Sequence, residues 1–218
     1  MSIKLIIFDL DGTLVDTSRD ITNALNHALT SHGLNTLTVE ETKRLVGEGI
    51  TRLVEKIIGE NKAGEREEII KKFLAYYEEH LVDFSYSYPD VKETLKTLKG
   101  YKKAVISNKR ESLSKRVLEK LDLLRYFDMV VGSDTTPERK PSPVPILYVL
   151  EHFHFQPDEA VIVGDSNFDI EAGKKSGVHT VAVTYGFRDR RYLSEAADII
   201  DDMGDLPALL DRSSFKLI

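Results

Sequence analysis

The sequence predicts a doubly wound, Rossmann-like α/β core with a parallel sheet and an α-helical cap domain inserted after the first strand. Short apolar runs recur along the chain, and they are continuous rather than alternating, as in strands buried on both faces of a parallel sheet. Amphipathic segments separate most of these runs. Between about residues 16 and 85 helical periodicity replaces the strand-like runs. We therefore expect residues 1–15 and 86–218 to form the core and residues 16–85 the cap.

The expected strands and core helices follow one another in a regular order. Strands are expected at 4–10, 103–107, 129–132, 160–164 and 180–184, with a weaker one at 198–200. Helices are expected over 112–121, 144–153 and 169–176. Gly177 stands directly after the last of these helices, where glycine commonly ends a helix.

The inserted segment contains three apolar stripes at helical spacing. We interpret the stripes as core packing rather than as ligand contacts. Thr17 and Thr38 are each followed three residues later by an acid, so both positions predict a capping box at a helix start. The stripes are Ile21, Leu25, Ala28 and Leu29; Leu53, Ile57 and Ile58; and Ile70, Phe73, Leu74, Tyr77 and Leu81.

Composition excludes several classes of function. The net charge of −6 argues against a nucleic-acid partner, and the short basic clusters at 102–103 and 188–191 are interpreted as solvated surface. The absence of cysteine removes thiolate nucleophiles and thiolate metal ligands. No segment approaches the roughly 18 apolar residues of a membrane span, and Asp9 and Asp11 interrupt the N-terminal apolar run. We expect a cytoplasmic protein without a membrane partner.

Polar residues follow the expected strands at positions where chemistry is usually found. Ligands of open parallel sheets bind at the carboxyl ends of the strands, so side chains placed there converge. Each position alone also fits ordinary turn or cap chemistry. Acidic pairs at the ends of buried strands repel one another, however, and need a compensating cation. The residues are Asp9, Asp11, Ser107, Asn108, Lys140, Asp165 and Asp169.

This combination of side chains suits phosphoryl transfer. Converging carboxylates form a hard oxygen site of the kind that Mg²⁺ prefers, and a bound metal offsets the repulsion between an anionic nucleophile and a phosphate. A serine hydroxyl and a lysine can hold the remaining phosphoryl oxygens and neutralise their charge. Without cysteine the nucleophile is oxygen or nitrogen, and aspartate is a known covalent nucleophile toward phosphorus.

The motifs together resemble those of the haloacid dehalogenase superfamily. That family carries Asp-x-Asp-Gly-Thr after its first strand, Ser or Thr after its second, a later Lys, and Gly-Asp-x-x-x-Asp. The resemblance extends from residue 3 to about residue 186, and the inserted helices look like the family's mobile cap. Within the family, the runs Phe8–Asp16, Ile106–Lys109 and Val46–Gly49 are most similar to phosphoglycolate phosphatases.

The resemblance implies roles for the acidic residues. Asp9 would attack phosphorus to form an aspartyl-phosphate and would also bind Mg²⁺. Asp11 would act first as general acid and then as general base, with its backbone carbonyl facing the metal. Asp165 would be the second carboxylate ligand, and Asp169 would support the metal directly or through water.

Other residues are expected to bind the substrate. By resemblance, Ser107, the backbone of Asn108, Lys140 and Thr13 would contact the phosphoryl group, and Lys140 would also orient Asp9. In the cap, the backbone N–H groups of Gly47 and Gly49 are candidates for binding a small carboxylate, and Arg52 is a candidate for pairing with it. A simple interhelical turn with a surface arginine explains these three cap residues equally well.

We expect a phosphomonoesterase that acts on a small phosphorylated metabolite, with 2-phosphoglycolate favoured. Asp11 argues against a dehalogenase, since the resemblance implies that those enzymes lack the second aspartate. Pyrophosphate, a sugar phosphate or a nucleotide are alternative substrates, and a phosphomutase is an alternative reaction. A non-catalytic receiver-like domain is a different class, disfavoured by the insertion. The expected partner is a small phosphate ester, and the sequence leaves a monomer and a homodimer open.

Overall fold

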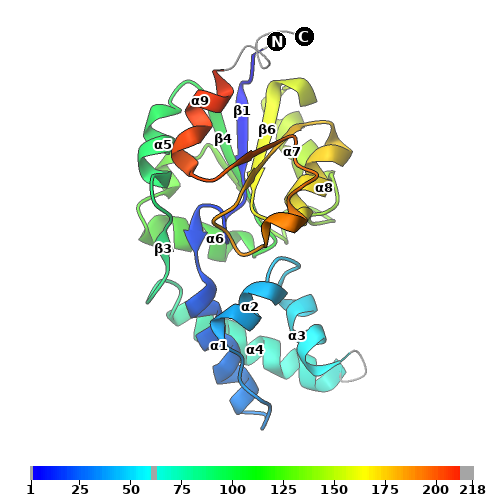
Figure 1. Cartoon of the computed structure of the whole chain (residues 1–218). Helices are drawn as coiled ribbons and strands as arrows, with labels where there is room; N and C mark the ends of the chain where they lie inside the picture. Colours follow the sequence, from blue (N-terminus) through cyan, green and yellow to red (C-terminus); the bar gives the residue numbers. More distant parts are fainter. Residues whose placement is uncertain (1, 60–62, 212–218) are drawn as a thin grey trace.

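Six parallel strands form one sheet in the computed structural model, which describes residues 2–59 and 63–211 (Figure 1). Their order is β5-β4-β1-β6-β7-β8, so the order reverses at β1. A crevice for ligands is therefore expected at the carboxyl end of β1. The strands are β1 Leu5–Phe8, β4 Lys102–Ile106, β5 Met129–Val131, β6 Ala160–Gly164, β7 His179–Val183 and β8 Asp198–Ile200, and all six expected strands are thereby confirmed.

Helices cover both faces of the sheet because successive side chains of each buried strand point to opposite sides. In β1, Ile6 and Phe8 pack into one apolar cluster and Leu5 and Ile7 into the other. The first cluster lies under α5 (Val91–Thr97), α6 (Glu111–Lys120) and α9 (Leu206–Leu210), and the second under α7 (Val144–Phe153) and α8 (Asn167–Ser176). Short 3₁₀ helices η1–η4 span Leu124–Tyr126, Pro157–Glu159, Arg190–Tyr192 and Met203–Asp205. This arrangement confirms the predicted α/β fold class.

Four helices lie beyond the carboxyl end of β1 (Figure 1). They are α1 Ser18–Thr30, α2 Val39–Leu45, α3 Ile50–Ile58 and α4 Ala63–Glu79. The chain enters them through β2 (Val15–Asp16) and leaves through β3 (Tyr86–Ser87), which pair as antiparallel strands. Among the described residues no helix is long and apolar enough to span a bilayer. The domain boundaries remain a prediction, and residues 1, 60–62 and 212–218 of the predicted domains lie outside the described residues.

One predicted capping box is confirmed and the other is wrong. At the start of α2, the Glu41 N–H donates to Thr38 Oγ1 at 3.2 Å, and the Thr38 N–H donates to Glu41 Oε2 at 2.8 Å. The Thr17 hydroxyl instead donates to Asp11 at 2.5 Å and leaves the start of α1 without a side-chain cap. Thr17 makes this tertiary bond because the end of β1 brings a carboxylate within its reach.

One basic cluster expected on the surface is partly buried. Lys103 is only 6% exposed, and its ammonium donates to the carbonyl oxygens of Leu98 at 2.8 Å and Tyr101 at 3.0 Å. Lys102 remains exposed and pairs with Asp128 at 2.6 Å. The difference arises because adjacent residues of a strand point to opposite sides, and only one side at this position meets solvent.

A buried carboxylate joins the first helix of the insertion to the segment that follows its last helix. Asp20 in α1 is 1% exposed, and its Oδ2 accepts from the Ser85 N–H at 2.8 Å and the Ser85 hydroxyl at 2.6 Å. The Phe84 N–H donates to the same oxygen at 3.0 Å. The two ends of the inserted helices are therefore held together beside β2 and β3.

Replacing Asp20 tests this connection. Asp20→Ala removes the acceptor of two backbone N–H groups and one hydroxyl, so the free energy of unfolding is expected to fall by about 3 kcal/mol. Equilibrium urea unfolding followed by circular dichroism measures the change. The control is Asp83→Ala, which removes an exposed carboxylate of the neighbouring loop. Equal losses in the two variants would contradict a special role for Asp20.

Candidate active site

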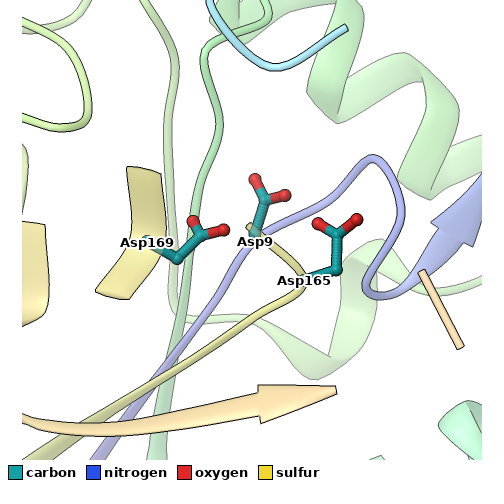
Figure 2. Close-up of side chains that lie close together, drawn as sticks. All are labelled: Asp9, Asp165 and Asp169. Carbon is teal, nitrogen blue, oxygen red and sulfur yellow. The ribbon is translucent and has the colours of Figure 1, made fainter. Parts of the chain in front are cut away.

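Three aspartates meet at the carboxyl ends of the central strands. Asp9 follows β1, Asp165 follows β6, and Asp169 lies in the first turn of α8. One carboxylate oxygen of each lies within 4.8 Å of those of the other two, and all three residues are buried. The parallel register, in which Phe8 is opposite Val163, places the two strand ends level. Figure 2 shows Asp9 between Asp165 and Asp169.

Burial makes this carboxylate cluster electrostatically unfavourable by itself. Desolvation raises the pKa of Asp9 well above its usual value; Lys140 opposes this shift, and the charges of Asp169 and Asp165 add to it. Burial and the charge of Asp169 raise the pKa of Asp165 to about 7, although the Phe187 N–H favours its ionised form. A hard cation relieves both effects, and the all-oxygen donor set fits Mg²⁺.

Lys140 connects two of the aspartates. Its ammonium donates to Asp9 Oδ1 at 2.7 Å, to Asp169 Oδ1 at 2.5 Å and to the Ile106 carbonyl at 2.7 Å. The side chain is 3% exposed. Burial alone lowers its pKa, but the two carboxylates outweigh burial and raise the pKa above the usual value for lysine. Lys140 therefore stays charged and holds Asp9 in one orientation.

The environment of Asp165 depends on close approach of the backbone. Gly12 has a φ of +94°, and a Cβ there would lie 2.3 Å from Asp165 Oδ2, so only glycine fits. The Phe187 N–H donates to Asp165 Oδ2 at 2.6 Å. Thr13, predicted to contact substrate, is fully buried and does not line the cavity. It lies behind Asp165, with its hydroxyl 3.4 Å from Oδ1, because the chain turns at Gly12.

Asp11 lies outside the three-carboxylate cluster. Its Oδ1 accepts from the Thr17 hydroxyl at 2.5 Å and from the ammonium of Lys109. Lys109 is 8% exposed; burial lowers its pKa, but Asp11 outweighs burial and the pKa is raised. The sequence interpretation missed Lys109, although it follows Ser107 and Asn108 directly at the end of β4. A metal contact through the Asp11 backbone carbonyl remains a prediction.

Ser107 and Asn108 both reach the cavity from the end of β4. Ser107 is 3% exposed. The Asn108 side-chain amide donates to the Gly47 carbonyl at 2.7 Å and to the Lys140 carbonyl at 2.9 Å. Asn108 thus connects the loop after β4 with both the cap and the lysine loop.

The cavity of about 170 Å³ lies between the strand ends and helices α1, α3 and α4. Its cap side is mainly apolar, with Thr51 and the Tyr77 hydroxyl as polar side-chain groups. Tyr77 is 1% exposed, and its hydroxyl has no hydrogen-bond partner among the described residues. The interpretation of the helical stripes as core packing alone was therefore incomplete. Stripe residues that also line the cavity are Ile21, Leu53, Ile70, Phe73, Leu74 and Tyr77.

Of the three cap residues predicted to bind substrate, two line the cavity and one does not. Gly47 and Gly49 line the cavity, and Gly47 has a φ of +128° with the Phe168 ring 2.9 Å from the position of a Cβ. Arg52 does not line the cavity. Its side chain is 54% exposed and pairs with Glu55 at 2.8 Å, and Glu55 also pairs with Arg66 of α4 at 2.6 Å. The prediction that Arg52 binds substrate is not supported by this placement.

Arg188 was interpreted as solvated surface, but it contacts the cap. The guanidinium donates to the carbonyl oxygens of Lys43 at 2.8 Å, Arg44 at 2.7 Å and Val46 at 2.5 Å. These carbonyls belong to the end of α2 and the residue that follows it, where a helix leaves acceptors unpaired. Arg188 follows β7, so the strand-end criterion applied to that strand also identifies it.

Comparisons with known proteins agree with this geometry. A family model for haloacid dehalogenase-like hydrolases matches residues 6–183. A phosphoglycolate phosphatase of Aquifex aeolicus is 43% identical over 84% of this chain and 86% of its own length. Phosphoglycolate phosphatase 1 of Pseudomonas aeruginosa is 36% identical over 97% of this chain and 81% of its own. The crystal structure of a predicted phosphoglycolate phosphatase from Haemophilus somnus superposes with a TM-score of 0.91, at 32% identity, covering 96% of this chain and 98% of that one.

The carboxylate cluster predicts pH-dependent metal binding. Because the pKa of Asp165 is raised to about 7, a proton competes with the metal below that pH. Mg²⁺ affinity measured by calorimetry is expected to be about tenfold weaker at pH 6 than at pH 8. Asp165→Asn is expected to abolish the binding, whereas Asp201→Asn, which changes an exposed acid, leaves it intact. Affinity that is independent of pH, or unchanged in Asp165→Asn, would contradict this metal site.

Proposed function

The chain belongs to the haloacid dehalogenase-like hydrolase family and is a phosphoric monoester hydrolase; we propose that it uses Mg²⁺ to hydrolyse 2-phosphoglycolate to glycolate and phosphate. The observation that carries this proposal is the buried contact of Lys140 with Asp9 and Asp169 beside Asp165, at the base of the cavity between core and cap. The names of similar proteins support the choice of substrate.

In the proposed mechanism Asp9 is the nucleophile. Lys140 holds Asp9 Oδ1, while Asp9 Oδ2 has no hydrogen-bond partner among the described residues. A carboxylate oxygen attacks phosphorus, the bond to the ester oxygen breaks, and an aspartyl-phosphate forms. Ser107 and the backbone of the same loop hold the phosphoryl oxygens. Asp9, Asp165 and Asp169 would hold Mg²⁺, which would supply positive charge to offset the repulsion between nucleophile and phosphate.

Asp11 is the proposed proton donor and acceptor. It gives a proton to the departing ester oxygen and later takes one from the water that hydrolyses the aspartyl-phosphate. The Thr17 hydroxyl and the Lys109 ammonium both contact Asp11 Oδ1, so they orient its carboxyl group. Asp9 and Asp11 thereby have separate environments. Asp9 lies beside the proposed metal site, and Asp11 lies beside Lys109.

The proposed cap, residues 16–85, favours a small substrate. Its mainly apolar side chains exclude water from the aspartyl-phosphate and offer few partners for the hydroxyl groups of a sugar or nucleotide. A receiver-like domain needs no such enclosure. Sugar phosphates, nucleotides and pyrophosphate are therefore expected to be poorer substrates than a short phosphorylated acid.

Phosphate release from a panel of substrates tests the proposal. The panel contains 2-phosphoglycolate, a sugar phosphate, a nucleoside monophosphate and pyrophosphate, each with Mg²⁺ or with EDTA. We expect 2-phosphoglycolate to be hydrolysed with the highest kcat/KM and EDTA to stop release. Asp9→Asn and Asp11→Asn should each lower kcat by about a thousandfold or more.

An exposed acid provides the matched control for these variants. Asp189→Asn removes the same charge from a surface position that pairs with Arg191, and its activity should equal that of the parent. Release that persists in EDTA, or that survives Asp9→Asn in protein free of contaminating phosphatase, is incompatible with the mechanism.

A further inference from the structure

We propose that Arg139 binds a second anionic group of the substrate and makes this enzyme selective for phosphate esters that carry a carboxylate close to the ester oxygen. The inference rests on the proposed phosphatase function. It concerns which esters the site accepts rather than how the phosphoryl group is transferred.

Most cations that line the cavity already have partners within the protein. Lys140 contacts Asp9 and Asp169, and Lys109 contacts Asp11. The two terminal nitrogens of Arg188 donate to three backbone carbonyls near the end of α2. These three side chains therefore have a structural or catalytic partner before any substrate enters.

Arg139 and Arg110 also line the cavity, and neither guanidinium forms a hydrogen bond or ion pair with another described residue. Arg110 is exposed, whereas Arg139 is half-buried. Partial burial of a guanidinium without an acidic partner is energetically unfavourable, because the charge loses contact with water. Binding of an anion offsets this cost. The planar fork of donors on a guanidinium matches a carboxylate in two parallel hydrogen bonds.

The position of Arg139 places it near the proposed phosphoryl site. It directly precedes Lys140, which contacts Asp9. A Cβ built on Gly49 would lie 3.7 Å from Arg139 Nη1 and 3.1 Å from the carbonyl oxygen of Asn108. The guanidinium therefore lies beside the loop that follows β4, on the side of the cavity where Gly49 enters from the cap.

Among the described residues, the cap contributes no charged side chain to the cavity. Its cap side is mainly apolar, and Arg52, the cap arginine nominated from sequence, is exposed and paired with Glu55. A substrate with a single charged end leaves Arg139 unpaired, whereas a phosphorylated hydroxy acid gives each anionic end its own cation. The geometry thus assigns selectivity for carboxylate-bearing esters to Arg139, which belongs to the α/β core and not to the cap.

The test compares two substrates of nearly equal size. 2-Phosphoglycolate has a carboxylate where ethyl phosphate has a methyl group. In Arg139→Met, kcat/KM for 2-phosphoglycolate is expected to fall by about tenfold to a hundredfold, mainly through KM. For ethyl phosphate the change should be less than about threefold. Arg139→Lys should restore part of the preference, and Arg110→Met should keep the parent's substrate ratio.

Binding measurements separate this inference from the proposed function. In an Asp9→Asn background, calorimetry gives the Kd of each ester without turnover, and Arg139→Met should selectively weaken 2-phosphoglycolate. If the parent hydrolyses no phosphomonoester with Mg²⁺, the proposed function fails while the binding arm still decides the role of Arg139. Equal losses for both esters, an unchanged ratio in Arg139→Met, or a lost preference in Arg110→Met instead would each overturn the assignment to Arg139.

Discussion

The balance between three buried carboxylates and one buried ammonium at the end of the sheet determines much of the surrounding structure. Lys140 contacts Asp9 and Asp169, and the remaining oxygen of Asp169 accepts from the Ser166 hydroxyl at 2.5 Å and from the Ser166 N–H at 3.1 Å. The start of α8 is thus part of the charged cluster. Around Asp165, Gly12 is required because any Cβ would overlap the carboxylate. Unpaired buried charge is costly, so each of these contacts constrains the backbone.

The cavity is completed by contacts in which core side chains donate to backbone carbonyls of the cap. Asn108 reaches the Gly47 carbonyl, and Arg188 reaches carbonyls at the end of α2, including that of Val46. These hydrogen bonds depend on where the cap backbone lies and not on the identity of the cap side chains. They place Gly47 against Phe168 and bring the apolar cap residues over the carboxylates. Chemistry at the strand ends and enclosure by the helices therefore depend on the same loops.

Much of the fold and of the acidic site was predictable because the signals are local. Continuous apolar runs identified every strand of the sheet, and the rule that ligands bind at strand ends brought Asp9 and Asp165 together. The same rule, applied to every strand, also reaches Lys109 and Arg188. Thr17 was misassigned because a capping pattern records only neighbours in sequence, whereas its hydroxyl found a carboxylate at the end of β1.

By itself the sequence determined the α/β class, the inserted helices and the acidic motifs, since periodicity and residue type at strand ends carry that information. Only the tertiary structure decided which cations face the cavity and which are already paired. Sequence patterns do not distinguish Arg52 from Arg139. In the structure Arg52 is exposed and pairs with Glu55, whereas the guanidinium of Arg139 lines the cavity without a partner among the described residues. Side-chain direction and the choice of partner arise from packing between distant segments, which no local pattern encodes.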